Sequence, residues 1–279
     1  MVVLASAACD HAFIRRTLRE RKLIAIPAID VPSVKSAMGS GQKFSLPRGE
    51  GECELRVRRR ETDKILLDEI AAFLVENCVY PYSVHLPAFD LGGREAAADV
   101  IKSINMIVEA IDPLLFVLHV SGPALDVWGP AFKDVLTDVP RIIALENVGV
   151  RGNRFRFPDR VQAILDSVGE PPENLAFCLD TTHVVPLNAG KGSNDDKERE
   201  IIDRVFEFIR VMGSKLKHVH LSNTRYEGER RLQHLPINAG FLDNEQIKQA
   251  LRFVGFEGRV VLEVPRNSAE RGIVEWNVL

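Results

Sequence analysis

The sequence predicts an α/β protein folded as one eight-stranded β/α barrel, and three observations carry that prediction. Apolar runs of strand length alternate with amphipathic helical segments from about residue 64 onward. These runs recur at close to the roughly 30 residues that one β/α unit of such a barrel needs. No G-x-G-x-x-G follows a strand, which argues against a doubly wound dinucleotide-binding sheet. At 279 residues the chain accommodates eight units, so we expect residues 1–279 to form a single (β/α)8 barrel domain.

Six strands and six helices are expected in the regular part of the chain. The predicted strands are Tyr82–Leu86, Leu114–Val120, Ile142–Val148, Leu175–Leu179, His218–Leu221 and Val260–Val264. The predicted helices are Lys64–Asn77, Arg94–Ile111, Pro130–Leu136, Pro158–Val168, Glu198–Met212 and Asn244–Phe253. Apolar residues at helical spacing identify the helices, and Ser193 with Asp196 supplies start chemistry for one of them.

The first 60 residues must supply the remaining strands of the barrel. The candidates are Val2–Ala7, Leu23–Ile29 and Glu54–Val57. Between them, Asp30–Glu52 is rich in Gly, Pro and Ser and shows no period, so we expect a long loop over one mouth of the barrel, a candidate lid. Arg151–Phe157 and Thr224–Ala239 follow strands and are expected as loops at the C-terminal mouth.

Composition excludes several classes of protein. Hydrophobic residues at 46% and charged residues at 27% are typical of a globular chain rather than a disordered one. The formal net charge of −3 gives no global attraction to nucleic acid, and no apolar stretch approaches the ~18 residues of a membrane helix. Four scattered cysteines form neither a disulfide framework nor a zinc knuckle, and residues 1–9 read as a first strand rather than a lipoprotein signal. We therefore expect a cytoplasmic protein without a membrane partner.

Polar residues at strand ends are the main functional signal. Six of the seven histidines lie in or just after an apolar strand run: His85, His119, His183, His218, His220 and His234. Three carboxylates, Glu146, Asp180 and Glu263, each follow the apolar residues of a strand. They therefore lie near the C-terminal ends of their strands, where barrel enzymes place their chemistry.

These carboxylates indicate a bound metal. A lone carboxylate buried in a strand is costly unless it is paired or metal-bound, although any one of them alone suits an ordinary hydrogen-bonded strand end equally well. Three at one mouth would repel one another, and a divalent cation relieves that repulsion. Oxygen and imidazole ligands suit Mn²⁺, Mg²⁺, Co²⁺ or Zn²⁺. His218 and His220 share a strand face at different depths, and we assign His220, nearer the strand end, to the metal and His218 to a packed or supporting role.

Seven short motifs stand in one order between about residues 80 and 264. They are Ser83-Val-His85-Leu-Pro87, Leu118-His119, Leu145-Glu146-Asn147, Leu179-Asp180-x-x-His183, His218-Val-His220-Leu221, His234-Leu-Pro-Ile-Asn-Ala-Gly240-Phe-Leu-Asp243 and Leu262-Glu263. In this order they resemble the xylose isomerase-like TIM barrel superfamily. That superfamily includes sugar isomerases and epimerases and the endonuclease IV type of AP endonuclease (AP endonuclease family 2).

The epimerase branch implies four protein ligands for one divalent metal: Glu146, Asp180, His220 and Glu263. It also implies that Glu146 and Glu263 exchange protons with the substrate as catalytic acid/base residues, one on each face. His183 would contact the substrate, and the segment from Arg225 to Gly240 would close over it. The implied activity is isomerisation or epimerisation of a sugar, sugar phosphate or keto acid beside a metal-polarised carbonyl.

Resemblance to endonuclease IV implies instead a trinuclear zinc cluster that hydrolyses DNA phosphodiesters. In that interpretation His85 and His119 join Glu146 on one zinc. Asp180, His220 and Glu263 complete the second zinc site, and His183 with His234 holds the third. The sequence departs from this pattern in three places: Leu232 replaces an aspartate, Asn147-Val-Gly149-Val-Arg151 replaces a glycine-rich segment, and Val120-Ser121-Gly122 follows His119 where Pro-Gly is usual. We therefore favour the isomerase or epimerase branch, with His85, His119, His183 and His234 as a second metal site or as substrate contacts.

Two arginine groups leave the partner open. Arg225, Arg230 and Arg231 suit an anionic substrate or a DNA phosphate equally, and we expect Arg225 to bind substrate. Arg56, Arg58, Arg59 and Arg60 follow a possible strand and could hold a phosphate or carboxylate, but we favour a solvated charged face interleaved with Glu61 and Asp63. Two further interpretations are other metal-dependent lyase or dehydratase chemistry on the same fold, and a barrel that binds a metal or small molecule without turnover. The expected partner is a small sugar-like molecule, with DNA only under the endonuclease alternative, and a homo-oligomer is left open.

Overall fold

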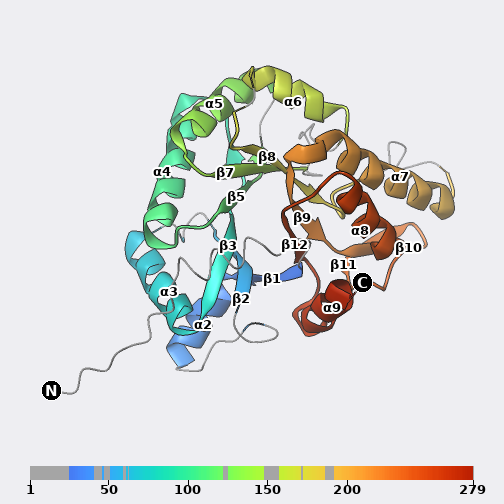
Figure 1. The fold of residues 1–279 in the computed structure, drawn as a ribbon, viewed down its shortest axis with the longest axis horizontal. Helices are drawn as coiled ribbons and strands as arrows, with labels where there is room; N and C mark the ends of the chain where they lie inside the picture. The colour runs from blue at the N-terminus through green and yellow to red at the C-terminus, as the bar shows by residue number, and fades with distance from the viewer. Residues whose placement is uncertain are drawn as a thin grey trace.

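The structure is a computed structural model, and it describes residues 25–40, 46, 51–58, 61, 63–121, 125–147, 157–170, 172–185 and 192–278. Eight parallel strands close into a barrel, and helices surround it on the outside (Figure 1). Around the barrel the strands are β1 (Ala25–Asp30), β2 (Gly51–Arg56), β3 (Val79–His85), β5 (Leu115–Leu118), β7 (Ile142–Glu146), β8 (Leu175–Asp180), β9 (Leu216–Leu221) and β12 (Arg259–Leu262). The predicted (β/α)8 barrel is confirmed.

A helix follows each barrel strand. These helices are α2 (Val31–Ser40), α3 (Lys64–Glu76), α4 (Arg94–Ala110), α5 (Leu125–Asp138), α6 (Arg160–Val168), α7 (Asn194–Met212), α8 (Asn244–Phe253) and α9 (Arg266–Val278). Two short strands, β4 (Phe89–Asp90) and β6 (Val120–Ser121), pair with each other above the barrel strands β3 and β5 that precede them. No helix within the described ranges is long and apolar enough to cross a membrane.

The segment Asp30–Glu52 is not the long loop that its composition predicted, because it contains α2. Asp30 Oδ1 accepts a hydrogen bond from Ser33 N at 2.7 Å, as a helix-capping side chain does. Pro32 stands in the first turn, where its missing N–H leaves no hydrogen bond unmade, and Val34 is buried. The proline and glycine residues of this segment suggested a loop, but residues 31–40 form a short helix. The predicted loop and lid are therefore wrong for residues 31–40.

Three other differences concern single elements. Thr224–Ala239, predicted as a loop, contains an antiparallel hairpin of β10 (Asn223–Glu227) and β11 (Arg230–Leu235). Helix α5 begins at Leu125, before its predicted start at Pro130, and carries that proline inside it. Helix α9 was not predicted. It completes the eighth unit, and a Cβ at its Gly272 would lie 3.0 Å from Leu262 Cδ1, so the glycine permits close packing on β12.

The predicted strand Val2–Ala7 lies outside the described residues, as do residues 151–156 of the predicted loop Arg151–Phe157. The barrel closes without a strand from the first 24 residues, because β1 pairs with both β2 and β12. The two other N-terminal candidates, Leu23–Ile29 and Glu54–Val57, correspond to β1 and β2.

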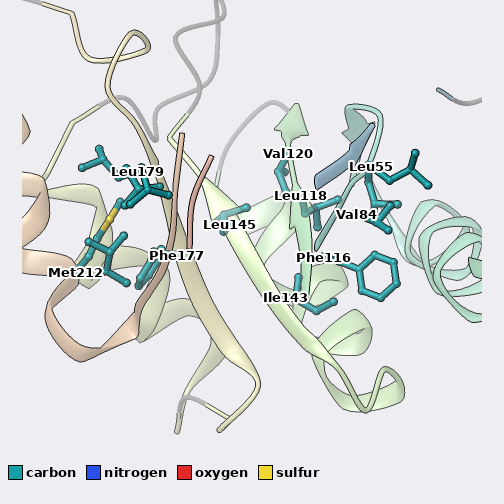
Figure 2. Close-up of a cluster of buried hydrophobic side chains, with 14 of the residues drawn as sticks. Leu55, Val84, Phe116, Leu118, Val120, Ile143, Leu145, Phe177, Leu179 and Met212 are labelled. Atoms are coloured by element: carbon teal, nitrogen blue, oxygen red, sulfur yellow. The ribbon is translucent and has the colours of Figure 1, made fainter. Parts of the chain in front are cut away.

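Alternation along the strands sorts their side chains into two apolar layers. Outward-facing residues such as Leu145, Phe177 and Leu179 pack beneath the helices, and Met212 at the end of α7 belongs to the same buried cluster (Figure 2). A separate buried cluster fills the interior of the barrel, formed by Leu115, Val117, Ala144, Ala176 and Cys178. Two residues further along each strand, the next inward-facing residue is His119 directly after β5, Glu146 on β7 and Asp180 on β8. The two-residue alternation that places apolar side chains inside the barrel therefore also places these polar side chains directly above them.

A buried ion pair occupies the opposite, N-terminal end of the barrel. Arg259 Nε donates to Glu52 Oε2 at 2.5 Å, and the two side chains are only 2% and 6% exposed. The guanidinium also lies 4.7 Å from the centroid of the Tyr82 ring, a cation–π distance. Because each charge is paired, this polar layer is compatible with a closed barrel floor.

Candidate metal centre

Inward-facing residues at the C-terminal ends of six strands converge on one point. His85 ends β3, Glu146 ends β7 and Asp180 ends β8. His220 lies one residue before the end of β9, while His119 and Glu263 directly follow β5 and β12. The structure thus brings the four predicted metal ligands to one mouth of the barrel, together with two of the additional histidines.

Glu146 is the centre of this cluster and is 1% exposed. Its Oε2 lies 2.7 Å from His119 Nε2 and 3.2 Å from His85 Nε2. The same oxygen lies 3.3 Å from His220 Nδ1, and Oε1 lies 3.1 Å from His183 Nδ1. The Glu146 carboxylate therefore contacts four histidines, which come from β3, from β9, from the position after β5 and from the loop after β8.

Asp180 and Glu263 approach the same point from either side of β9. Asp180 Oδ1 is fixed by hydrogen bonds from Thr182 N at 2.6 Å and Thr182 Oγ1 at 2.8 Å. This leaves Asp180 Oδ2 facing the cluster, 3.3 Å from His183 Nδ1. Glu263 Oε1 lies 3.2 Å from His220 Nδ1. One oxygen of each carboxylate thus lies within 4.8 Å of a ring nitrogen of His220.

The donor atoms fit a divalent cation. His220 Nδ1 and Asp180 Oδ2 are buried and make no hydrogen bond to the part of the chain that the structure describes. Buried polar atoms without a partner are costly, and coordination would satisfy both. Among the described residues, four groups of side chains offer ligand atoms within 4.8 Å of one another around this point: Asp180, His220 and Glu263; His85, His119 and Glu146; Glu146, Asp180 and His183; and Glu146, Cys178 and His220. The first group carries oxygen and imidazole donors and could hold one cation, and Glu146 belongs to each of the other three groups.

Electrostatics keep the central carboxylate ionised. Burial alone would raise the pKa of Glu146, but the charges of His220 and His119, together with hydrogen bonds from His119 and His183, hold that pKa well below its ordinary value. Burial also opposes the charged form of His183, yet the hydrogen bond to Glu146 and the charge of Asp180 raise its pKa to about 8. Burial raises the pKa of the Cys178 thiol to about 12, so this inward-facing cysteine carries a neutral thiol at neutral pH.

The β10–β11 hairpin covers one side of the mouth. Its Arg231 Nη1 donates to Val184 O at 2.7 Å, and Gln233 Nε2 donates to Thr182 O at 2.9 Å, which ties the hairpin to the loop after β8. His234 reaches the cluster edge, with Nδ1 3.6 Å from Glu263 Oε2, and adopts a positive φ of 54°. Arg225 instead pairs with Glu227 Oε1 at 2.6 Å on the exposed side. Its substrate-binding role stays a prediction.

Three residues at the site were not assigned to it from the sequence: Glu54, Ser83 and Arg56. Glu54 is fully buried inside the barrel, 2.8 Å from His218 Nε2 and 3.0 Å from His220 Nε2 through its Oε2. Ser83 Oγ donates to the same oxygen at 3.2 Å. Arg56, expected as part of a solvated face, contacts Glu263 directly and lies 3.5 Å from Glu54 Oε1 through Nε. His218, as predicted, is packed below His220 rather than at the mouth.

A model of the xylose isomerase-like TIM barrel family matches residues 44–277 of this chain. The chain belongs to that family. This match extends the resemblance seen in the strand-end motifs toward the N-terminus, over β2 and α3, where Glu54 lies.

Two curated relatives point to different chemistries. A probable endonuclease 4 of Symbiobacterium thermophilum is 36% identical over 108 residues, which are 37% of each chain. A mannonate dehydratase of Enterococcus faecalis is 24% identical over 169 residues, which are 57% of this chain and 37% of that protein. The chain therefore matches little more than a third of the length of either relative.

Solved structures share the fold over almost the whole chain. A D-tagatose 3-epimerase-like protein is similar with a TM-score of 0.66 at 16% identity, covering 92% of this chain and 97% of that one. The 3-keto-D-glucoside 4-epimerase of E. coli has a TM-score of 0.57 at 13% identity, covering 92% and 100%. A xylose isomerase-like TIM barrel protein from Mycobacterium smegmatis, solved in complex with magnesium, has a TM-score of 0.60 at 12% identity, covering 89% and 86%. At these identities the likeness concerns the fold.

Proposed function

We propose that this chain is a divalent-metal-dependent isomerase or epimerase that acts on a sugar, a sugar phosphate or a keto acid. The observation that carries the proposal is the placement of two glutamates around one imidazole nitrogen. Glu146 Oε2 and Glu263 Oε1 lie 3.3 and 3.2 Å from His220 Nδ1, and Asp180 faces the same point. Removing a proton from a substrate carbon and returning one to it needs two such carboxylates, and here both lie beside the buried, metal-binding imidazole of His220.

In this proposal the metal ligands are Glu146, Asp180, His220 and Glu263. A bound divalent cation supplies polarisation of a substrate carbonyl, which acidifies the neighbouring C–H. Glu146 and Glu263 then act as the catalytic pair, one removing the proton and the other returning one. His183 is held on Glu146 and Asp180 and is suited to donate a hydrogen bond to a substrate oxygen. The hairpin of β10 and β11 limits the access of water from its side.

Support for a sugar-like substrate comes from the relatives and neighbours. Two structural neighbours are named for epimerase activity on sugars, and one curated relative is a mannonate dehydratase. Magnesium in the Mycobacterium smegmatis neighbour is compatible with a divalent cation here. Arg56, beside Glu263 at the mouth and 36% exposed, is a cationic contact that would suit a phosphate or carboxylate on the substrate.

The second candidate function is an endonuclease IV-like AP endonuclease. The observation favouring it is the pair of histidines on Glu146, because His85 and His119 approach one carboxylate oxygen as ligands of a second metal would. The local identity to a probable endonuclease 4 supports it as well. Against it, Leu232 on β11 provides no ligand for a third zinc beside His183 and His234. We rank this candidate second.

The test is solvent-deuterium incorporation into a panel of ketoses, ketose phosphates and keto acids, run with Mn²⁺, Mg²⁺, Co²⁺ or Zn²⁺ and followed by NMR. The proposal predicts exchange at the carbon next to the carbonyl in at least one panel member, abolished by a chelator. Cleavage of an abasic-site duplex by the same preparation is the parallel arm. Cleavage without exchange in any panel member would overturn the isomerase proposal in favour of the endonuclease.

A further inference from the structure

Glu54 is a buried ionisable group of the barrel interior to which the proposed reaction gives no role. It faces inward from β2, shows no exposed surface, and sits one layer below the metal-binding residues. A lone ionised carboxylate at this depth would be strongly destabilising. Its surroundings compensate it: Ser83 and two imidazoles reach one oxygen, and Arg56 Nε lies 3.5 Å from the other.

The geometry of these contacts determines which imidazole nitrogens carry protons. An ionised carboxylate oxygen accepts hydrogen bonds and donates none. His218 Nε2 at 2.8 Å and His220 Nε2 at 3.0 Å both point at Glu54 Oε2, so each of these nitrogens must donate. A neutral His220 then has its lone pair on Nδ1. That atom faces Glu146 Oε2 and Glu263 Oε1 at 3.3 and 3.2 Å.

We propose that Glu54 is a positioning residue that fixes His220 with its proton on Nε2 and its Nδ1 lone pair directed at the metal. The inference rests on the metal site proposed above and adds a residue on the far side of the imidazole. Carboxylate support of a metal-bound histidine fixes the tautomer and the ring orientation and raises the basicity of the ligand. Here one carboxylate oxygen supports His220 directly, and His218 and Ser83 contact the same oxygen.

The metal affinity of Glu54→Gln is the first test, measured by calorimetric titration of the metal-free protein with Zn²⁺ and Mn²⁺. Glutamine keeps the size but removes the charge, so we expect the affinity to fall by about 10- to 100-fold. Glu52→Gln is the matched control, because Glu52 lies on the same strand, is also buried, and pairs with Arg259 rather than with a histidine. Its metal affinity should stay within about twofold of wild type, although its thermal stability should fall.

The tautomer of His220 is the second test, and its main measurement uses wild-type protein. In zinc-loaded wild-type protein with ¹⁵N-labelled histidine, the His220 ring should show a directly bonded proton at Nε2 and none at Nδ1. The signal is assigned by its loss in His220→Asn. In Glu54→Gln the Nε2–H signal should shift or broaden, which a purely structural role of Glu54 would not cause.

Several results would overturn the inference. A proton on Nδ1 of His220, equal metal affinities of Glu54→Gln and wild type, or an equal loss in Glu52→Gln would each do so while leaving the proposed function standing. Wild-type protein that binds no divalent metal would overturn the proposed function and this inference together. If Glu54→Gln does not fold, the wild-type ¹⁵N spectrum alone decides.

Discussion

At the scale of single residues, Glu146 and Glu263 each combine metal binding with proton transfer in the proposed reaction. Glu→Gln at either position keeps one oxygen ligand and removes the base, so metal should still bind, more weakly. The rate of deuterium exchange should fall by about 10²–10⁴, the usual contribution of a general acid/base group. The measurement is exchange rate at saturating metal, with metal content determined on the same samples. Glu263→Gln that exchanges as fast as wild type would remove Glu263 from the catalytic pair.

His85 and His119 separate the two candidate functions. Their Nε2 atoms lie 3.2 and 2.7 Å from Glu146 Oε2. If they shape the substrate pocket, His85→Ala and His119→Ala should keep one tightly bound metal and lose less than about tenfold in exchange rate, below the loss expected at either glutamate. If they hold a second zinc, either variant should lose one metal per chain together with all activity. Metal content measured alongside activity distinguishes these outcomes.

The site residues that were predictable from the sequence are those that interrupt an apolar run. Glu146, Asp180 and Glu263 stand out because each directly follows a run of apolar residues, nearly all of them buried. Glu54 did not stand out, because Glu52-Cys-Glu54-Leu-Arg56 alternates charged and apolar residues as a half-exposed strand does. In the barrel the charged face is the interior one, where Glu52 and Glu54 find Arg259, His218 and His220 on strands far away in the sequence. Such long-range pairing leaves no local signal.

At the scale of elements, α8 offers a helix cap that is separate from the site. Asp243 Oδ1 accepts from Glu245 N at 2.9 Å and Gln246 N at 3.2 Å. Asp243→Ala should lower the free energy of unfolding by about 1 kcal/mol, whereas Asp243→Asn keeps an acceptor and should cost less. Urea unfolding at pH 7 measures both. A loss in Asp243→Asn equal to that in Asp243→Ala would contradict the capping role.

The same cap has a defined pH dependence. The hydrogen bonds from Gln246 lower the pKa of Asp243 below its ordinary value. A carboxyl whose folded-state pKa is depressed contributes stability above its unfolded pKa of about 4, and this contribution is lost as pH falls through the folded pKa. The stability difference between wild type and Asp243→Asn should therefore shrink below about pH 4. A difference that is constant from pH 7 to pH 3 would contradict this.

Helices and strands were predictable from the sequence where their buried residues form an apolar pattern, and they were missed where most of their residues are exposed or polar. The β7 and β8 strands are buried on both faces and read as continuous apolar runs. The β10–β11 hairpin is largely exposed, so its residues show no apolar alternation. The signal that could have revealed it is its two-residue turn, in which Gly228 adopts a φ of 60° between Glu227 and Arg230.

At the scale of the whole molecule, the cluster at the mouth links metal binding to stability. Buried carboxylates that converge without a cation repel one another, so the metal-free fold should be the less stable form. A metal at about 100 times its dissociation constant stabilises the folded state by about 2.7 kcal/mol, if it does not bind the unfolded chain. For a chain of this size that corresponds to a rise of several degrees in Tm. Thermal melts with and without a chelator measure it, and coincident melts would contradict metal binding at a buried site.

The number of metal ions per chain tests the central claim most directly. The claim is that Glu146, Asp180, His220 and Glu263 hold a catalytic divalent cation, while Leu232 removes the third site of a zinc cluster. Elemental analysis of protein loaded with excess Zn²⁺ or Mn²⁺ and then desalted should find one or two ions per chain, with the tightest lost in Asp180→Ala. Three tightly held zinc ions, together with cleavage of an abasic-site duplex that stops on chelation, would contradict it.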